Sequence, residues 1–546
     1  MKRTTNFKKM QWLFGLMTLA MVAAACGSNN NTEASSEPAA NSNASDKETL
    51  YIGLTNAPGA LNPINATDAS AQYITRMLYP TLLDQPEELT FEGNLATDFE
   101  TKDNQTYTIS LREDAVWSDD EPITAEDVAY TLNLIANPKV ETVFGAQIST
   151  LEGVEESGKF VEGATEISGV SVVDEHTLTL KTKVPVDPNY VKEAIGFGVR
   201  IVPKHIVEKE NLSDLASSSF VTQPTVSGSL YKFVKYEQDS YVQLEVNPSY
   251  YKGEPKLKNV YLRVLSGTNL VTELQSGGID MAAGSGIGVI PVSEVDSLKK
   301  NDNLVIEGYP GATIQFMYIN NEKFDKDVRL AMTYAINRQA LVDQLFRGEA
   351  ETVNTIYLNQ TPYFDKSIKE IPYDVEKAKE LLADSGFDLT QEIELTVPTG
   401  HKAREQSANL IQQNLEAAGF KVKQVSFDFV TALTNVRKGD YDLGFIGIPM
   451  SSDPDQSYLW TPNGSSNFGH VDDEQLTKLF EEGKAGVSME ERLPIYGELQ
   501  EYFRDNAFAV GLYSDYQYKA QAKNLTGGVK PYWAGSLYDM QEWTKK

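Results

Sequence analysis

Strand-like and helix-like segments alternate through residues 393–448, and this alternation restricts the fold more than any other feature of the sequence. A strand pattern, IELTVPTG, precedes the helix pattern REQSANLIQQNLEAAGF, the strand pattern KVKQVSFDF and the helix pattern VTALTNVRKG. The next segment, YDLGFIGI, is an almost continuous apolar run, which is typical of a strand covered on both faces. This order predicts an α/β architecture with parallel strand pairing and right-handed crossovers.

Similar signals occur elsewhere in the chain. The segment TLYIGLT, residues 49–55, is expected to be the first strand. Thr124 and Asp127 have the spacing of a capping box and predict the start of a helix that ends at Asn137-Pro138. Residues 373–386, YDVEKAKELLADSG, predict a helix with Gly386 at its C-terminus.

Two segments of the chain follow a similar plan. VTELQSGGIDMAAG and TNVRKGDYDLGFIG both combine a short helix, a glycine, an aspartate and an apolar strand. Asp280 and Asp442 occupy comparable places in the two segments. The similarity indicates either two related lobes or a common helix-to-strand joint that occurs twice.

Length and charge limit the classes of partner. Residues 48–546 have a globular composition, and a body of that length normally forms two or three domains. The chain has 48 basic and 77 acidic residues, a formal net charge of −29. Such a surface repels nucleic acid and anionic lipid headgroups. It suits solubility in a polyanionic envelope or, alternatively, the attraction of cationic ligands.

The N-terminus predicts export. Four basic residues precede an apolar run at residues 10–25, which is shorter than the ~20 residues that span a bilayer. The only cysteine, Cys26, follows three alanines in a pattern that resembles the bacterial lipobox, which implies cleavage and diacylation at Cys26. Residues 26–47 lack aromatic and large aliphatic side chains and are expected to form a flexible tether. The alternative is an ordinary secretory signal with an incidental cysteine.

Signals for catalysis or metal binding are weak. The four histidines, His176, His205, His401 and His470, are far apart in the sequence, and no nucleophile elbow is present. Paired acids such as Asp119 with Asp120, or Asp453 with Asp455, could act as an acid–base pair in sugar hydrolysis but more often form solvated turns. No catalytic residue, metal site or cofactor is therefore expected.

Six blocks, in order along the chain, resemble the family 5 bacterial extracellular solute-binding proteins, the oligopeptide, dipeptide and nickel receptors of ABC importers. The first is AVWSDDEPITAEDVAYTL at residues 115–132, with Asp120 where the family usually has glycine. The others are VPKHI, VNPSYYKGEPKLKNV, LQSGGIDMA, DVRLAMTYAINRQALV and YDVEKAKELLADSGF.

The resemblance implies a periplasmic-binding-protein type II-like α/β fold, with two lobes joined by a hinge and an extra domain inserted in the first lobe. The expected limits are residues 1–25 for the signal peptide, 26–47 for the tether, 48–88, 170–268 and 506–546 for lobe I, 89–169 for the inserted domain II, and 269–505 for lobe II (domain III).

Ligands of open α/β sheets bind beyond the carboxyl ends of strands, which indicates the loops at residues 56–61, 283–286 and 447–455. The resemblance implies that Gly447, Ile448 and Pro449 pair with a peptide main chain and that Phe429 lines a side-chain pocket. The candidate ligand-binding residues are Asn56, Ala57, Pro58, Gly59, Ala283, Gly284, Phe429, Gly447, Ile448, Pro449, Ser451, Asp453 and Asp455.

Peptide receptors of the family bind the ligand's α-ammonium with an aspartate, but Met450 and Ser451 occupy the corresponding places here. Either Asp453 or Asp455 substitutes, or the ligand has no free amine at that point. An oligosaccharide ligand would favour stacking on Tyr458, Trp460 and Trp533, although each is more often a core residue.

The sequence thus predicts a monomeric, lipid-anchored receptor on the extracytoplasmic face of a bacterial membrane. It would capture short peptides and deliver them to ABC permease subunits, without nucleic acid as a partner. The alternatives are the same role for an oligosaccharide or chelated metal, and a surface hydrolase.

Overall fold

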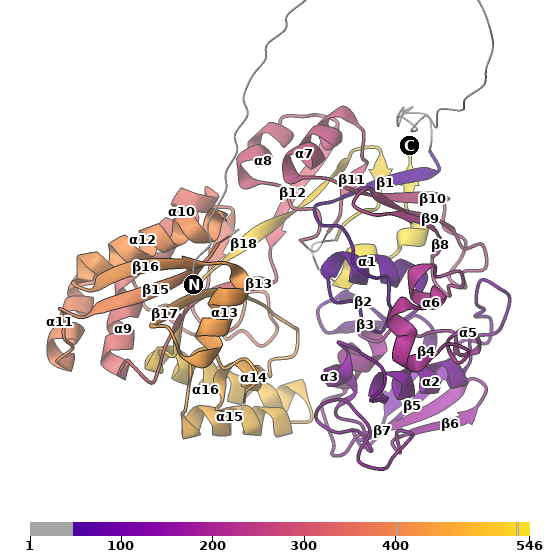
Figure 1. Ribbon diagram of the computed structural model, residues 1–546, viewed down its shortest axis with the longest axis horizontal. Coiled ribbons are helices and arrows are strands. Elements are labelled where there is room, and N and C mark those ends of the chain that lie inside the picture. Colours follow the sequence, from indigo (N-terminus) through magenta and orange to yellow (C-terminus); the bar gives the residue numbers. More distant parts are fainter. Residues whose placement is uncertain (1–46, 285, 400–401, 463, 531, 533) are drawn as a thin grey trace, which may run out of the picture. The chain divides into compact units, whose positions relative to one another are not determined.

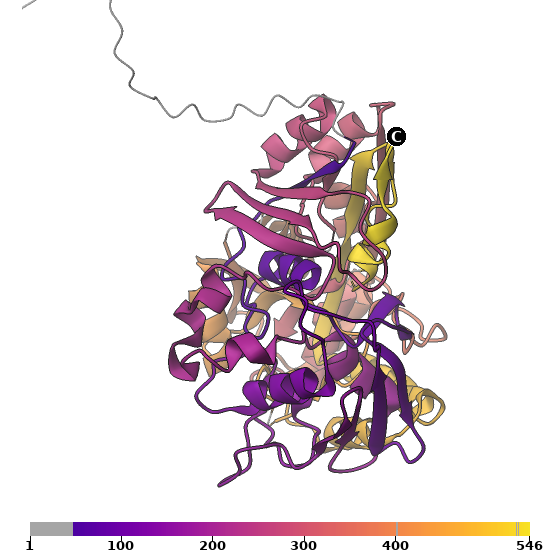
Figure 2. The same ribbon diagram turned by 90° about the vertical axis from the view of Figure 1, so that its right-hand side faces the viewer.

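A long strand, β18 (Ala509–Ala522), belongs to both halves of the largest sheet (Figures 1 and 2). The computed structural model describes residues 47–546 except 285, 400–401, 463, 531 and 533. The expected signal peptide, Cys26, almost all of the tether, His401 and Trp533 therefore lie outside the described residues.

The largest sheet has the strand order β16-β15-β17-β13-β18-β11-β1-β10-β9-β8, with β12 and β14 also paired to β18. Its strands are β1 (Thr49–Leu54), β8 (Tyr231–Glu237), β9 (Tyr241–Val246), β10 (Asn259–Val264), β11 (Met281–Ala282), β12 (Leu304–Pro310), β13 (Thr313–Ile319), β14 (Ala350–Thr352), β15 (Glu392–Pro398), β16 (Lys421–Phe427), β17 (Leu443–Pro449) and β18.

Two antiparallel chain segments connect the lobes. The N-terminal part of β18 pairs with β13 and β14, whereas its C-terminal part pairs with β12 and β11. The second segment consists of β12 and β13, which follow each other directly in the chain. It crosses between the lobes in the direction opposite to β18. These segments form the hinge of a type II periplasmic-binding-protein fold.

Three smaller sheets lie outside this sheet. In the four-stranded sheet β4-β5-β7-β6, β4 and β5 lie in the region expected to form the inserted domain, whereas β6 and β7 lie in the region expected to belong to lobe I. The strands are β2 (Leu83–Glu87), β3 (Thr90–Gly93), β4 (Ala96–Thr101), β5 (Thr106–Leu111), β6 (Val170–Asp174), β7 (Thr177–Lys181), β19 (Leu525–Thr526) and β20 (Thr544–Lys545).

Most first-lobe helices are short. They are α1 (Ala69–Leu78), α2 (Ala125–Ala136), α3 (Gly145–Ile148), α4 (Pro188–Val191), the π-helical turn η1 (Lys192–Phe197), α5 (Lys204–Val207), η2 (Leu212–Ser217), α6 (Ser219–Thr222), α7 (Gly267–Ser276), α8 (Val292–Leu298), η3 (Ala534–Leu537) and η4 (Met540–Glu542). The first lobe is here the part of the chain that carries β11, β1, β10, β9 and β8 and these helices, so it includes residues 269–298, which the predicted limits assign to lobe II. The domain limits given above remain predictions. The α7 and α8 residues Leu270 and Leu298 pack with Tyr518 and Ala520 of β18.

The second lobe has hydrophobic clusters on both faces of β13 and β17. Met317, Leu443 and Phe445 belong to one cluster, whereas Phe316 and Ile446 belong to the other. The helices are α9 (Lys326–Ala335), α10 (Arg338–Phe346), α11 (Val375–Ser385), α12 (Lys402–Ala418), α13 (Phe429–Lys438), α14 (Ser457–Trp460), α15 (Glu474–Ala485) and α16 (Met489–Asn506). The prediction of a strand covered on both faces at residues 441–448 is confirmed.

The pairing is mixed rather than wholly parallel. β15 pairs in parallel with β16 and β17, and β1 pairs in parallel with β10 and β11, as the alternating pattern predicts. β18 pairs antiparallel with β12 and β13, because the two segments cross between the lobes in opposite directions. β13 also pairs antiparallel with β17. In the described part of the chain, no helix combines the length and apolar character needed to cross a bilayer.

The two similar sequence segments have the same local geometry. Asp280 accepts a hydrogen bond from the backbone N–H of Tyr51 (2.8 Å), and Asp442 accepts one from the backbone N–H of Glu394 (2.9 Å). Each carboxylate also pairs with a lysine, Lys545 in the first lobe and Lys323 in the second. The similarity is therefore a matching helix-to-strand joint in both lobes, at the start of β11 and β17.

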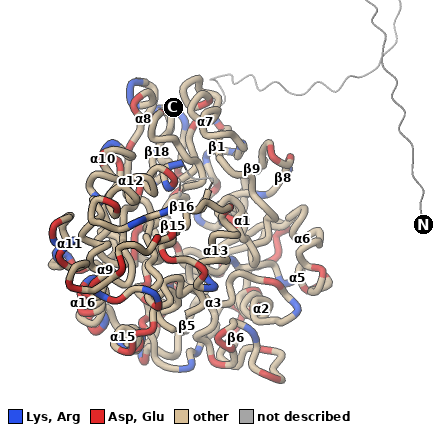
Figure 3. The backbone as a smooth tube through the Cα atoms, turned by 60° about the vertical axis from the view of Figure 1, so that its left-hand side comes forward, with Lys and Arg blue, Asp and Glu red and all other residues tan. Residues whose placement is uncertain are grey.

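Acidic and basic residues are scattered over elements of both lobes (Figure 3). Asp and Glu positions occur along α11, α15 and α16 as well as on first-lobe loops. Many of them form salt bridges at the surface, as Asp114 does with Arg112 and Glu376 with Lys379. The net negative charge is thus spread over the surface.

The block at residues 115–132 forms a structural turn and helix. Trp117 is fully buried, and Asp120 has a positive φ of 68°, which explains why glycine suits this position. Asp127 accepts hydrogen bonds from the backbone N–H groups of Thr124 and Lys204, both at 2.9 Å. The predicted capping box is confirmed, and it also anchors α5.

We expect Asp127→Ala to lower the free energy of unfolding by about 1–3 kcal/mol, because two backbone donors lose their acceptor. Glu126→Ala is the matched control, since Glu126 is exposed and pairs with Lys204 at the surface. Urea denaturation monitored by circular dichroism measures both. Equal effects of the two substitutions would contradict this account.

Candidate functional site

The loops predicted after β1 and β11 lie together. The backbone N–H of Thr55 donates to Ile287 O (2.8 Å), and that of Ala283 donates to Gly53 O (2.9 Å). The 56–59 loop is held by Tyr236 Oη, which donates to Pro58 O at 2.6 Å. Gly284 packs against Val529, with no room for a Cβ atom. Asn56, Ala57, Pro58, Gly59, Ala283 and Gly284 thus belong to one region beyond the ends of β1 and β11.

The predicted second-lobe segment has one strand edge without a partner. β17 pairs with β13 as far as Pro449, but its parallel pairing with β15 ends at Thr396–Gly444. Within the described part of the chain, Gly447, Ile448 and Pro449 are therefore paired on one side only. A side chain at Gly447 would collide with the Gln315 amide. This edge has room in the sheet pattern for an additional extended strand.

Phe429 lies at the same end of the second-lobe sheet. It is the first residue of α13, directly after β16, and 44% of its surface is exposed. The Arg404 guanidinium lies 5.9 Å from the centre of its ring. The structure therefore brings Phe429 close to the carboxyl ends of β15 and β16, with an apolar face available for contact.

Ser452 joins the two lobes. It is 1% exposed; its backbone N–H donates to Glu193 Oε1 (3.4 Å), and its Oγ lies 3.3 Å from Tyr532 Oη. Its neighbour Ser451 is exposed and donates to Asp453 O. Glu193 lies on η1 and Tyr532 near the C-terminus, so both contacts connect the first lobe to the 447–455 segment.

The β2–β3 turn also reaches the second lobe. Leu89, with a φ of 53°, packs against a second-lobe hydrophobic cluster. Burial raises the pKa of the adjacent Glu88 to about 7, and a hydrogen bond with Ser452 opposes the rise. Burial likewise raises the pKa of Glu193 to about 7, with the negative charge of Asp453 as the second cause.

Asp453 is bound within the protein. Arg492 donates to both of its carboxylate oxygens (3.0 and 3.2 Å) and also to Asp187 Oδ2 of the first lobe (3.1 Å). Arg492 and Asp187 are almost fully buried. Burial raises the pKa of Asp453 and Arg492 opposes that rise, while Asp453 raises the pKa of Arg492 against the effect of burial. The three residues form a charged bridge between the lobes.

Asp455 stabilises the same turn. Its Oδ1 accepts the backbone N–H of Ser457 (3.0 Å), and its Oδ2 lies 3.7 Å from Lys484 Nζ. Asp453 and Asp455 line a pocket with Asp187, Tyr190, Lys484 and Arg492. Both aspartates thus have protein cations beside them.

The described aromatic candidates for sugar stacking, Trp460 and Tyr458, differ in their exposure to solvent. Trp460 is fully buried, stacks on Tyr318 with ring centres 5.3 Å apart, and donates to Gln456 Oε1. Tyr458 is 44% exposed. Trp460 is therefore a core residue and has no face available for a ligand.

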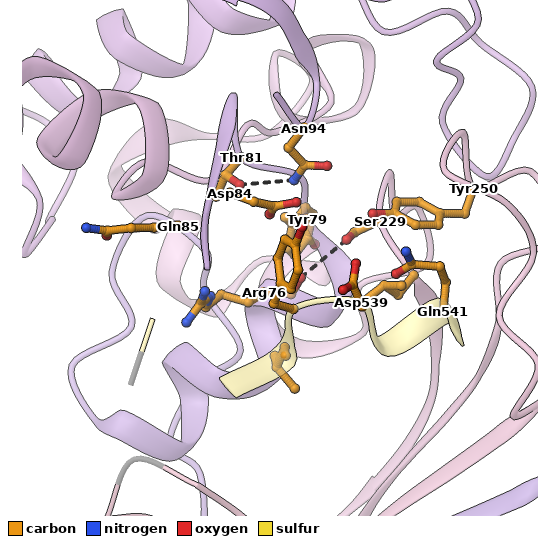
Figure 4. A pocket seen from close by; sticks show the side chains of 13 residues that line it. Arg76, Tyr79, Thr81, Asp84, Gln85, Asn94, Ser229, Tyr250, Asp539 and Gln541 are labelled. Atoms are coloured by element: carbon orange, nitrogen blue, oxygen red, sulfur yellow. Dashed lines mark hydrogen bonds between the residues drawn. The ribbon is translucent and has the colours of Figure 1, made fainter. Parts of the chain in front are cut away.

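A second pocket lies entirely among first-lobe elements (Figure 4). Ser229 Oγ donates to Arg76 O, and Asn94 Nδ2 donates to Thr81 Oγ1. None of the predicted ligand-binding residues lines this pocket. Among the described residues, no group of three or more His, Cys, Asp or Glu is arranged to hold a metal ion.

Sequence reasoning missed Glu88, Glu193, Tyr532, Arg492 and Asp187. No motif marks them, and they are far apart in the chain. The sequence signal was indirect: Met450 and Ser451 stand where the family has an aspartate, and the sequence offered only Asp453 or Asp455, or a ligand without a free amine, in explanation.

Comparison with known proteins identifies the family. The model for "Bacterial extracellular solute-binding proteins, family 5 Middle" matches residues 90–470, and the chain belongs to this family. It is 25% identical to the oligopeptide-binding protein AppA of Bacillus subtilis, over 97% of each chain.

Solved structures show the same fold. The substrate-binding protein CtaP of Listeria monocytogenes superposes with a TM-score of 0.80 at 26% identity, covering 92% of this chain and 99% of that one. AppA of Bacillus subtilis in complex with a nonapeptide gives a TM-score of 0.74 at 23% identity, covering 91% and 99%.

We expect Arg492→Met to lower the free energy of unfolding by about 3–5 kcal/mol, because two buried carboxylates lose their counter-ion. Lys484→Met removes a positive charge from the same pocket, but Lys484 is 69% exposed, so its effect should be small. Thermal unfolding at neutral pH compares the two variants. A loss for Arg492→Met no larger than for Lys484→Met would rule out the bridge as a stabilising element.

A pH dependence follows from Glu193. The raised pKa means that the folded protein binds more protons than the unfolded chain between about pH 4.5 and 7, so this group reduces stability as pH rises. Glu193→Gln removes the group. The thermal midpoint of the variant minus that of the unmodified chain should therefore increase from pH 5 to pH 8. A constant difference across that range would show that Glu193 titrates normally.

Proposed function

We propose that this protein is the substrate-binding component of an ABC importer and captures short peptides between its two lobes. Family membership and the names of the oligopeptide-binding relatives support this proposal. The observation that carries it is the unpaired edge of β17 at Gly447, Ile448 and Pro449, where a peptide main chain can pair as an added strand. Pro449 lacks an N–H and can only accept.

The proposed binding surface combines both lobes. Asn56, Ala57, Pro58, Gly59, Ala283 and Gly284 contribute from the first lobe, and Phe429 offers an apolar face for a side chain of the peptide. Ser451, Asp453 and Asp455 follow the β17 edge. Recognition through main-chain groups tolerates many side chains, so the protein should select peptides less by their sequence than by their length.

Capture involves no covalent chemistry. A ligand that touches both lobes favours the closed arrangement by the difference between its affinities for the closed and open states. We further propose that the protein is a monomer anchored by a lipid at Cys26 on the extracytoplasmic face of the membrane. There it delivers the bound peptide to permease subunits. An oligosaccharide is the weaker candidate cargo because Trp460 lies in the core.

Isothermal titration of the purified full chain with alanine peptides of increasing length tests the proposal. We expect dissociation constants in the micromolar range or below for at least one length. N-methylation of one central residue of that peptide should weaken binding about tenfold, because a main-chain hydrogen bond is lost. The matched control is N-methylation of a terminal residue outside the bound segment.

Failure of every peptide to bind, together with recovery of glycans from native mass spectrometry of the protein, would overturn peptide capture. Turnover of a bound peptide on prolonged incubation would instead show a hydrolase.

A further inference from the structure

Two acidic side chains of the first lobe are covered by the second lobe. Glu193, on η1, accepts the backbone N–H of Ser452 through Oε1, and Glu88, in the β2–β3 turn, has a hydrogen bond with the Ser452 side chain. The other carboxyl oxygen of Glu193, Oε2, is buried and has no hydrogen-bond partner among the described residues. Leu89, next to Glu88, packs against a second-lobe hydrophobic cluster. Contact between the lobes therefore removes both carboxyl groups from water.

The groups that face Glu193 are acidic or neutral. Asp453, from the second lobe, and Glu88 are its charged neighbours, and both disfavour a negative charge on it. The phenol groups of Tyr190, on α4, and Tyr532, near the C-terminus, lie nearby. Burial raises the pKa of both phenols, so they stay neutral. A carboxylate in this position therefore meets like charge in a buried site.

The basic groups of this region are engaged elsewhere. Arg492 binds two aspartates, as described above, and Arg76, on α1, acts electrostatically on Tyr532. Within the described residues, neither Glu88 nor Glu193 has a lysine or arginine partner. Closure thus places two carboxyl groups in a buried site without a counter-ion. This burial costs less free energy when the carboxyl groups are protonated.

We infer that Glu88 and Glu193 couple closure of the lobes to proton uptake, so that an acidic medium favours the closed state. In the open state Ser452 is withdrawn and both groups face water, so they ionise as ordinary glutamates. In the closed state burial raises the pKa of each to about 7. The closed state therefore binds more protons than the open state between about pH 4.5 and pH 7, and closure weakens as the pH rises through that range.

Proton uptake on peptide binding tests this coupling, which adds a form of regulation to the proposed function and in this test rests on it. Isothermal titration of the full chain with the alanine peptide that binds best is repeated at pH 6 in buffers of different ionisation enthalpy. The slope gives the number of protons taken up, and we expect about one to two per bound peptide. Binding should weaken about tenfold or more from pH 5 to pH 7, a range in which the peptide termini do not titrate.

Glutamine variants assign the protons to the two glutamates. Glutamine resembles the protonated acid, so Glu193→Gln and Glu88→Gln should each reduce proton uptake and tighten binding several-fold at pH 7, with little change at pH 5. A mere loss of contact would instead weaken binding at both pH values. Glu87→Gln is the matched control, because Glu87 is exposed and adjacent to Glu88, and it should keep the full pH dependence. Circular dichroism confirms folding, and Glu88→Gln serves alone if Glu193→Gln does not fold.

The outcomes separate the coupling from peptide capture. If peptides bind without net proton uptake, or if affinity does not fall from pH 5 to pH 7, the coupling is wrong and peptide capture stands. If no peptide binds, the proposed function fails, and small-angle X-ray scattering of the free protein tests the coupling. The radius of gyration should then be smaller at pH 5 than at pH 7 for the unmodified chain, and equal at both for the variant that combines Glu88→Gln with Glu193→Gln. Equal radii for the unmodified chain would overturn the coupling.

Discussion

Backbone pairing between two oppositely directed segments holds the two lobes together. β18 lies beside β12 in one lobe and beside β13 in the other, and the register changes between Gln315 and Phe316. β18 is buried near both of its ends, at residues 509–514 and 520–521, so it cannot slide without moving apolar side chains out of two cores. Every inter-lobe contact described above depends on this connection for its geometry.

Local structure could be predicted largely from the sequence. The α2 capping box, the glycine-terminated α11 and the parallel β15–β16 pair depend on residues close together in the chain. The similarity of Asp280 and Asp442 also indicated matching joints in the two lobes. The antiparallel crossing of β12, β13 and β18 was not predicted, because no short-range pattern specifies which distant strands become neighbours.

The candidate site was predictable only in part. Residues that follow strand ends, such as Gly447 and Ala283, could be located because their position depends on strand order. Glu88, Glu193 and Arg492 could not, since each acts through partners far along the chain. Asp453 illustrates the difference: the sequence indicates an exposed acid after a strand, whereas its pairing with Arg492 depends on how α16 packs.

If the protein captures peptides as proposed, the Arg492 bridge has a consequence for release of the ligand. When the lobes separate, Arg492 can keep its two hydrogen bonds to Asp453 within the second lobe and lose only the one to Asp187. Asp187 then regains hydration, which offsets much of the lost attraction. The contact therefore favours a well-defined closed geometry but opposes opening only weakly. This balance suits a binding protein that must release its ligand.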